Sequence, residues 1–201
     1  SYTVSDDGLR YTFKLRQDAQ WALFSGHKNV LGENYADTFD INVYAEDFAF
    51  AFDRIFDPAI NSPYSALFSS IASYSADDKY TFSITLNSKD DNLLYNLASA
   101  GAVPCDREFY ELTGGKYGLD AKYSLCNGPF NVGKWIDGTS IRIDRNNEYS
   151  GENKVMPSSV TFYVNTSRDA VADKMNNGIY DVAYLNNLNY SRITDKSSFN
   201  T

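Results

Sequence analysis

The sequence is poor in the side chains that most often carry out chemistry. It has one histidine, His27, and two cysteines, Cys105 and Cys126, among 201 residues. A Ser-His-Asp or Cys-His arrangement would depend on that single histidine, which has no supporting motif around it. The cysteines fit no zinc-ligand spacing, and the acidic residues lack the alternating pattern of a calcium loop. We therefore expect no catalytic residue, no metal site and no cofactor.

Basic residues and long apolar runs are also scarce. The chain has 18 Lys and Arg against 26 Asp and Glu, a net charge of -8, and no basic stripe with interleaved aromatics. This balance argues against a nucleic-acid partner. No apolar run approaches the roughly 20 residues that cross a bilayer, and the first residues, Ser1-Tyr2-Thr3-Val4, do not read as a signal peptide. We expect any signal or lipid anchor to lie upstream of this chain.

Aromatic residues, by contrast, are abundant. They make up 15% of the chain, with 16 Tyr and 13 Phe, and hydrophobic residues reach 43%. A chain of this length and composition suits one domain or lobe with a single core. Tyrosine suits half-buried sheets and the walls of peptide or sugar clefts. The simpler interpretation, favoured by composition alone, is that Tyr replaces other surface hydrophobes in a secreted protein.

Alternating apolar and polar residues predict several half-buried strands. The dipeptide Asp137-Gly138 is a strong turn signal, so the strands on either side of it should form an antiparallel hairpin. The predicted strands cover residues 11–16, 79–86, 128–135, 139–144, 160–164 and 182–185.

The clearest helical pattern covers Ala45–Phe56. Phe48, Phe52 and Ile55 recur at helical spacing and give this segment one apolar face. Tyr44 stands at its N-cap and should not accept the capping bonds, a loss of about 1 kcal/mol. Further helices are predicted over residues 64–73, 91–100, 107–112 and 168–177.

Two other segments carry organisational predictions. Residues 22–42 contain Gly26, Gly32 and the only histidine, and we expect an irregular surface excursion there. At the other end, a strand, a helix and a strand over residues 160–185 suggest a βαβ unit with parallel strands.

Short phrases occur in a fixed order along almost the whole chain. They are Asp6-Asp7-Gly8-Leu9-Arg10-Tyr11, Val43-Tyr44-Ala45-Glu46-Asp47-Phe48, Asn61-Ser62-Pro63-Tyr64, Asn127-Gly128-Pro129-Phe130, Arg145-Asn146-Asn147-Glu148-Tyr149 and Asn177-Gly178-Ile179-Tyr180-Asp181. In this order the sequence resembles the peptide-binding family of extracellular solute-binding proteins, family 5, whose best-known members are oligopeptide and dipeptide receptors of ABC importers. The resemblance runs from about Ser5 to Tyr184.

The resemblance implies an α/β fold. We expect a lobe like those of type II periplasmic binding proteins, with a mixed β-sheet and flanking helices, truncated relative to the two-lobe receptor. The chain is interpreted as an internal fragment or a single lobe. Roughly residues 10–125 would form the smaller subdomain, and roughly residues 126–190 would form part of the subdomain next to the hinge.

The implied function is that of a receptor and not of an enzyme. A family member of this kind captures oligopeptides or a related small solute outside the membrane and delivers it to the permease subunits of an ABC importer. The implied location is extracellular, as a cell-surface lipoprotein, or periplasmic. The alternative is an interaction or regulatory domain that retains the same fold without a role in transport.

The resemblance also implies candidate ligand-binding residues. Ser62 and Tyr64 would lie where the smaller subdomain meets the ligand cleft, with Tyr64 offering its ring and hydroxyl. Tyr184, Asn186 and Asn187 would line the floor of the cleft near the hinge, where amides and main-chain groups could pair with an extended peptide.

Cys105 and Cys126 are a candidate disulfide. In an exported protein such a bridge would have a chain-entropy effect on the order of 3 kcal/mol. Two free buried thiols are equally consistent with the sequence.

Overall fold

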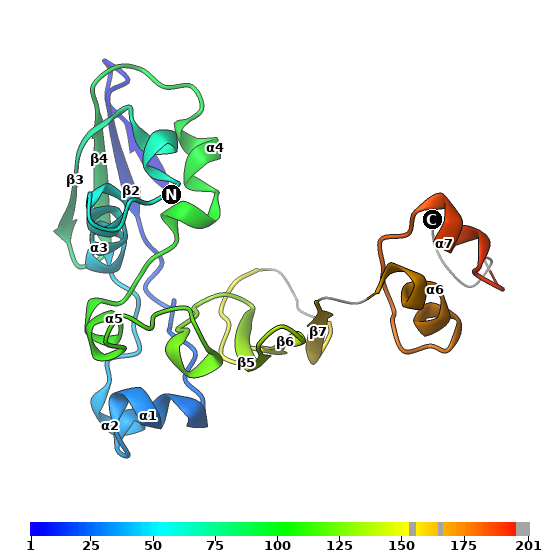
Figure 1. The fold of residues 1–201 in the computed structure, drawn as a ribbon. Helices are drawn as coiled ribbons and strands as arrows, with labels where there is room; N and C mark the ends of the chain where they lie inside the picture. Colours follow the sequence, from blue (N-terminus) through cyan, green and yellow to red (C-terminus); the bar gives the residue numbers. More distant parts are fainter. Residues whose placement is uncertain (153–155, 165–166, 196–201) are drawn as a thin grey trace. The chain divides into compact units, whose positions relative to one another are not determined.

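The computed structural model describes residues 1–152, 156–164 and 167–195 (Figure 1). The chain divides into two compact units. Unit 1 consists of Ser1–Lys134 and Ile143–Val160, and unit 2 consists of Trp135–Arg142 and Thr161–Thr201. Each unit is described by itself. The predicted subdomain boundary near residue 125 stays a prediction.

An antiparallel sheet of four strands forms the upper part of unit 1 in Figure 1. Its strand order is β1-β2-β4-β3, and the central strand β4 is buried at nearly every position. Phe13 of β2 lies opposite Phe82 of β4, and Tyr74 of β3 lies opposite Ile84. The strands are β1 (Tyr2–Val4), β2 (Arg10–Lys14), β3 (Ile71–Asp78) and β4 (Thr81–Leu86). The predicted strands over 11–16 and 79–86 are thereby confirmed.

The predicted helix over residues 64–73 is wrong. A short 3-10 helix, η2 (Ser65–Phe68), occupies its first half, and β3 begins at Ile71. The register of β3 shifts between Ile71 and Ser73 and again between Ala76 and Asp78. Each bulge adds a residue, which breaks the period-two pattern that would have identified the strand.

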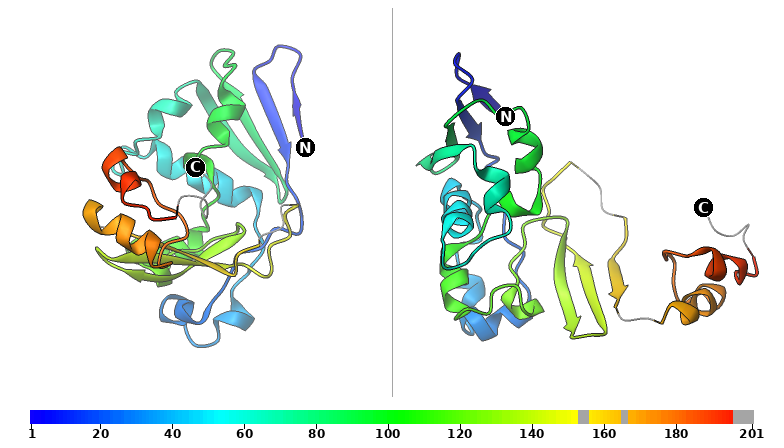
Figure 2. Two further views of the ribbon diagram at one scale, coloured as in Figure 1. Left: turned by 90° about the vertical axis from the view of Figure 1, so that its right-hand side faces the viewer. Right: turned by 45° about the horizontal axis from the view of Figure 1, so that its top comes forward.

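The helix α3 (Ala45–Phe56) packs against this sheet, as its apolar pattern predicts (Figure 2). Phe52 is fully buried, with its ring centroid 5.2 Å from that of Phe68, 5.3 Å from that of Tyr74 and 5.8 Å from that of Phe82. Aliphatic side chains complete this core, among them Ile71 of β3 and Ile84 and Leu86 of β4. The helix therefore fixes one face of the sheet through a cluster of rings.

The N-terminus of α3 is stabilised in a way that the sequence analysis missed. The Asp47 carboxylate accepts a hydrogen bond from the Tyr44 backbone N–H at 2.7 Å, while the Tyr44 hydroxyl donates to Asp40 at 2.9 Å. Burial raises the pKa of Asp47 to about 7, and the negative charges of Asp106 and Glu46 add to this effect. The hydrogen bond to Asp47, a residue in the first turn of α3, thus offsets the loss of stability expected from Tyr44 at the N-cap.

The excursion over residues 22–42 is not irregular, which corrects the prediction for this segment. It contains η1 (Ser25–His27), α1 (Lys28–Leu31) and α2 (Tyr35–Thr38). A second core cluster, made of Trp21, Phe39, Val43, Phe109 and Leu125, ties this segment to the rest of unit 1. The periodicity was hidden because each helix is only about one turn long.

The remaining helices of unit 1 are also short. The predicted helix over 107–112 is confirmed, and Asp106 caps it by accepting a hydrogen bond from the Phe109 N–H at 2.7 Å. The helix predicted over 91–100 is shorter and ends in a 3-10 turn. These elements are α4 (Leu93–Leu97), η3 (Ala100–Ala102), α5 (Arg107–Leu112) and η4 (Ala121–Tyr123).

A second sheet has the order β5-β6-β7, with β5 (Phe130–Ile136), β6 (Ser140–Arg145) and β7 (Ser159–Tyr163). The predicted hairpin is present, and Gly138 adopts a φ of 63° in its turn. In unit 1 the buried Asn146 side chain donates to the Gly128 carbonyl at 3.0 Å, and its N–H donates to the Pro129 carbonyl at 2.9 Å. These hydrogen bonds join the phrase over residues 127–130 to the phrase over residues 145–149, so both phrases have a structural role here.

Unit 2 contains α6 (Arg168–Asn176) and α7 (Asn187–Ser191), and Ala172 and Met175 of α6 form a small core with Ile193, which follows α7. The strand predicted over residues 182–185 is absent from the described part of the chain, and with it the predicted βαβ unit. Val182 is 87% exposed. A strand needs a partner for its backbone hydrogen bonds, and the described residues supply none here. Within the described ranges, no helix combines the length and apolar character needed to cross a bilayer.

Candidate functional site

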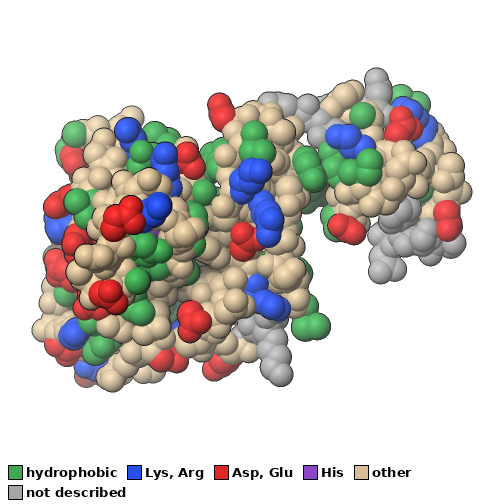
Figure 3. All heavy atoms as spheres, turned by 90° about the horizontal axis from the view of Figure 1, so that it is seen from below, with side chains coloured by type: hydrophobic (Ala, Val, Ile, Leu, Met, Phe, Trp, Pro, Cys, Tyr) green, Lys and Arg blue, Asp and Glu red, His purple; other side chains and the backbone are tan. Residues whose placement is uncertain are grey.

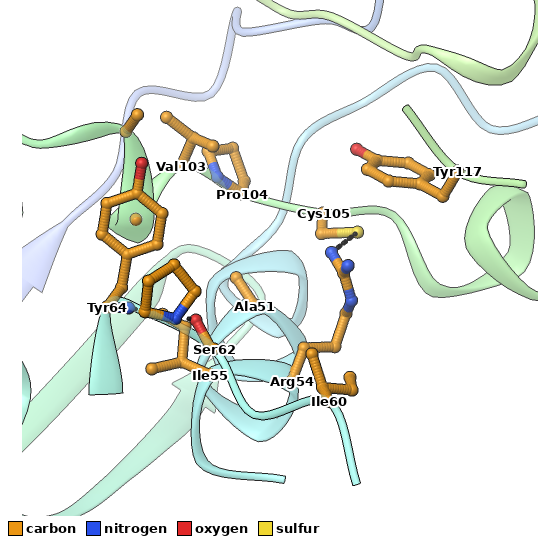
Figure 4. Close-up of a pocket in the computed structure, with 13 residues that line it drawn as sticks. Ala51, Arg54, Ile55, Ile60, Ser62, Tyr64, Val103, Pro104, Cys105 and Tyr117 are labelled. Atoms are coloured by element: carbon orange, nitrogen blue, oxygen red, sulfur yellow. Dashed lines mark hydrogen bonds between the residues drawn. The ribbon is translucent and has the colours of Figure 1, made fainter. Parts of the chain in front are cut away.

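Unit 1 contains a cavity of about 310 Å³ beside the C-terminal half of α3 (Figure 4). Its apolar lining includes Ile55, Ile60, Pro63 and Tyr64. Val103 and Pro104, from the segment that follows η3, line it as well. The walls are therefore mostly apolar, as in many small-molecule sites.

The sequence positions Ser62 and Tyr64 through the turn after α3. The Asp57 side chain accepts a hydrogen bond from the Ala59 N–H at 2.8 Å, and Asn61 adopts a left-handed φ of 50°. Asn is among the few residues that adopt this conformation at low cost. The chain therefore turns back, and Ser62 and Tyr64 line the cavity.

Gly101 sets the position of the Tyr64 ring. A β-carbon at Gly101 would lie 2.7 Å from two atoms of that ring. Any larger residue at position 101 would push Tyr64 away, so the glycine is required for this close approach. Tyr64 remains 36% exposed, so its ring can still meet a ligand.

The polar end of the cavity is built around Arg54. Its guanidinium lies over the Tyr110 ring, 4.3 Å from the centroid, and over the Tyr117 ring at 5.2 Å. Nη1 donates to the Cys105 sulfur at 3.4 Å. Nε is buried and has no hydrogen-bond partner among the described residues.

Burial dominates the electrostatics of the groups around Arg54. It raises the pKa of the Cys105 thiol, and the positive charge of Arg54 opposes that rise. It also raises the pKa of Tyr117 beyond its usual range. Both groups are therefore neutral at physiological pH, and the guanidinium carries the charge at this end of the cavity.

The two cysteines are free thiols in the structure, with Cys105 buried and Cys126 partly buried. The Cys126 carbonyl accepts a hydrogen bond from the Ala22 N–H at 2.7 Å. The Cys105 thiol interacts with the Tyr117 hydroxyl, which adds to the raised pKa of Tyr117. The disulfide between them stays a prediction.

The other three candidate ligand residues belong to unit 2. Tyr184 is fully exposed. Asn186 is the N-cap of α7, where its side-chain oxygen accepts a hydrogen bond from the Asn189 N–H at 2.8 Å. Asn187 is the exposed first residue of the same helix. Within unit 2 these residues are neighbours along one segment, and their ligand role stays a prediction.

Sequence reasoning missed Arg54, Gly101 and Tyr117. Arg54 lies in the last turn of α3, where a basic residue normally complements the helix dipole. Nothing in the local sequence indicates that residues from positions 105, 110 and 117 surround its side chain. The cavity could therefore be predicted only on its Ser62 and Tyr64 side.

Other clusters of titratable residues were compared with the requirements of a metal site. In the described ranges no group of three or more His, Cys, Asp and Glu side chains is placed to hold a metal ion. Acidic side chains, shown in red in Figure 3, are scattered over the face drawn there, in keeping with the net charge of -8. Asp47 is buried with a raised pKa, but its carboxylate accepts a hydrogen bond from the Tyr44 N–H at the N-terminus of α3.

Comparison with known proteins identifies the family. The sequence matches the profile described as "Bacterial extracellular solute-binding proteins, family 5 Middle" over residues 1–201. The chain belongs to this family. This confirms the resemblance inferred from the ordered phrases.

Relatives in the family include peptide receptors. The chain is 27% identical over 218 residues to the oligopeptide-binding protein AliB of Streptococcus pneumoniae, an alignment that covers 97% of this chain and 31% of AliB. The chain therefore spans about a third of the length of this relative.

Solved structures show the same fold. The substrate-binding domain of an oligopeptide ABC transporter from Bacillus anthracis matches with a TM-score of 0.82 at 24% identity, covering 98% of this chain and 38% of that chain. OppA of Listeria monocytogenes, solved with a bound peptide, matches with a TM-score of 0.77 at 24% identity, covering 90% and 36%. The predicted α/β fold of a type II binding protein is confirmed, and the chain corresponds to part of it.

Proposed function

We propose that this chain is part of the substrate-binding component of an ABC importer. In this role the protein captures oligopeptides or a related small solute outside the membrane and delivers it to the permease subunits. Family membership and the names of the relatives support the proposal. The extracellular or periplasmic location and the absence of catalysis are parts of the same proposal.

The observation that carries the proposal is the cavity bordered by Ser62 and Tyr64. These are the residues that the family resemblance assigns to the ligand cleft, and both border an apolar cavity with a free aromatic ring. Tyr184, Asn186 and Asn187 would contribute a second set of contacts. Amide side chains and an exposed tyrosine suit an extended peptide, whose backbone groups need hydrogen-bond partners.

The test is peptide binding by the full-length protein with Tyr64 replaced. Tyr64→Ala should weaken the binding of short peptides about tenfold, because a buried aromatic contact contributes on the order of 1–2 kcal/mol. Isothermal titration calorimetry measures the affinity, and thermal unfolding shows whether the fold is intact.

Tyr95→Ala is the matched control. Tyr95 lies on α4 in the same unit, is 82% exposed and does not border the cavity, so its removal should leave affinity unchanged. Unchanged affinity in folded Tyr64→Ala would remove Tyr64 from the site.

A further inference from the structure

The guanidinium of Arg54 is an unusual feature for the wall of a small cavity. The chain carries a net charge of -8, yet the described residues that line the cavity include this one cation and no carboxylate. The Asp106 carboxylate acts on the neighbouring Cys105, but its oxygen already caps α5. The cavity is therefore a place where an anion meets a positive charge in a mostly negative molecule.

The arrangement holds the guanidinium ready for a ligand. The rings of Tyr110 and Tyr117 lie against it and fix its plane. Nη1 is used by Cys105, which leaves the edge that carries Nε and Nη2. Nε is buried without a hydrogen-bond partner among the described residues. A buried donor without an acceptor is unfavourable, and an entering acceptor would remove that penalty.

The acceptor that fits this edge is a carboxylate. Two parallel N–H groups of arginine match the two oxygens of a carboxylate, which makes the contact both strong and directional. The apolar residues Ile55, Ile60 and Val103 then face the part of the ligand next to the carboxylate. A volume of about 310 Å³ is at the small end of ligand sites, which suits one residue or a small organic acid.

We propose that the cavity binds the carboxylate of a ligand with a small apolar body, through Arg54, with the Tyr64 ring against that body. The ligand is the C-terminal residue of a short peptide or a free organic acid, which share this chemistry. The inference rests on the proposed role of Ser62 and Tyr64 in solute binding and adds the chemical class of the group that they contact.

The test uses a matched pair of probes on the 201-residue chain. N-acetyl-leucine carries the carboxylate, and N-acetyl-leucinamide has the same body without the charge. Titration is followed through the backbone amide signals of Gly101, Val103 and Cys105 in proton-nitrogen NMR spectra. The acid should bind in the millimolar range, and the amide at least about fivefold more weakly, because it forms no charge-assisted pair.

Two variants assign the effect to Arg54. Arg54→Gln should abolish the preference for the acid. Arg107→Gln is the matched control, because Arg107 also stacks on a ring, that of Phe50 at 4.1 Å, and pairs with Asp53 at 3.0 Å, but does not line the cavity. It should keep the full preference. Equal binding of acid and amide by the unmodified chain would overturn the proposal, and this comparison holds even if Arg54→Gln fails to fold.

Two further probes separate the sources of the carboxylate. Binding of Gly-Gly-Leu would support a peptide C-terminus, and binding of 4-methylpentanoate alone would support a free organic acid. Absence of acid binding, with weakened peptide binding by full-length Tyr64→Ala, would overturn this inference and leave the proposed function standing. Acid binding at Arg54 with unchanged peptide affinity in Tyr64→Ala would support the carboxylate site and overturn the proposed role of Tyr64 in peptide binding.

Discussion

At the scale of single residues, His27 is a buried, uncharged side chain whose protonation would lower stability. It is fully buried, with its ring centroid 4.4 Å from that of Phe24 and 5.2 Å from that of Phe109. Nε2 lies 3.2 Å from the Ser124 carbonyl, which can only accept, so Nε2 carries the proton. Nδ1 has no partner among the described residues. Burial lowers the pKa of His27 to about 4.

The lowered pKa predicts an acid-sensitive contribution. The unfolded chain takes up a proton on His27 near pH 6.5, whereas the folded chain resists it down to about pH 4. The stability that depends on neutral His27 is present above pH 6.5 and is lost progressively as the pH falls toward 4, by up to about 3 kcal/mol. Urea unfolding from pH 7.5 to 4.5 should show this loss in the parent and not in His27→Gln. Parallel profiles for the two proteins would contradict it.

The contribution of Asp47 to the free energy of unfolding changes with pH in the opposite direction to that of His27. Its pKa is raised from 3.8 to about 7, so its contribution is present below pH 3.8 and is lost as the pH rises through 7. Asp47→Asn keeps an oxygen for the Tyr44 N–H and carries no charge. We expect this variant to be more stable than the parent at pH 8, by on the order of 1–3 kcal/mol, with the difference shrinking toward pH 5. A gain that does not change with pH would show that the charge of Asp47 is not its cause.

At the scale of elements, α3 joins the four-stranded sheet to the cavity. Phe52 lies on its sheet-facing side, and Arg54 lines the cavity. Phe52→Ala should lower the free energy of unfolding by about 3–5 kcal/mol, because the fully buried ring would leave a cavity. Chemical denaturation gives this value. Phe56→Ala on the same helix is the comparison, since its half-buried ring should cost less. Equal losses would show that Phe52 is not the central contact.

The sequence predicts some elements well for clear physical reasons. The apolar spacing of α3 and the capping residue Asp106 before α5 are local signals, and both helices form where expected. Strand β3 was missed because two bulges disturb its alternation. The strand predicted over residues 182–185 reflects local composition, whereas a strand also needs a partner, which local composition does not reveal.

The candidate site also has a part that local sequence predicts and a part that depends on tertiary packing. Ser62 and Tyr64 belong to a recognisable phrase that predicts them as site residues, and the turn at Asn61 brings them to the cavity. Arg54 and Tyr117 meet only because α3 packs beside the segment around Cys105. Such a meeting depends on tertiary packing and leaves no mark in the local sequence.

At the scale of the whole molecule, the chain spans about a third of the length of the relative AliB. Ligand sites normally enclose about 70–90% of a small ligand, and the cavity of about 310 Å³ is too small to enclose a peptide of several residues. The 201-residue chain should therefore bind short peptides no more tightly than the high micromolar range. Calorimetry with a mixed peptide library tests this. Submicromolar binding would mean that the complete site lies within these residues.

The two bulges in β3 have a consequence beyond the pairing with β4. β3 is an outer strand of its sheet, eight residues long, and its exposed side could serve as a template for another chain. The bulges interrupt the regular spacing of its free backbone groups. A second copy approaching this edge would therefore meet a broken hydrogen-bond pattern. The irregularity that hides the strand in the sequence therefore also protects the sheet against edge-to-edge aggregation.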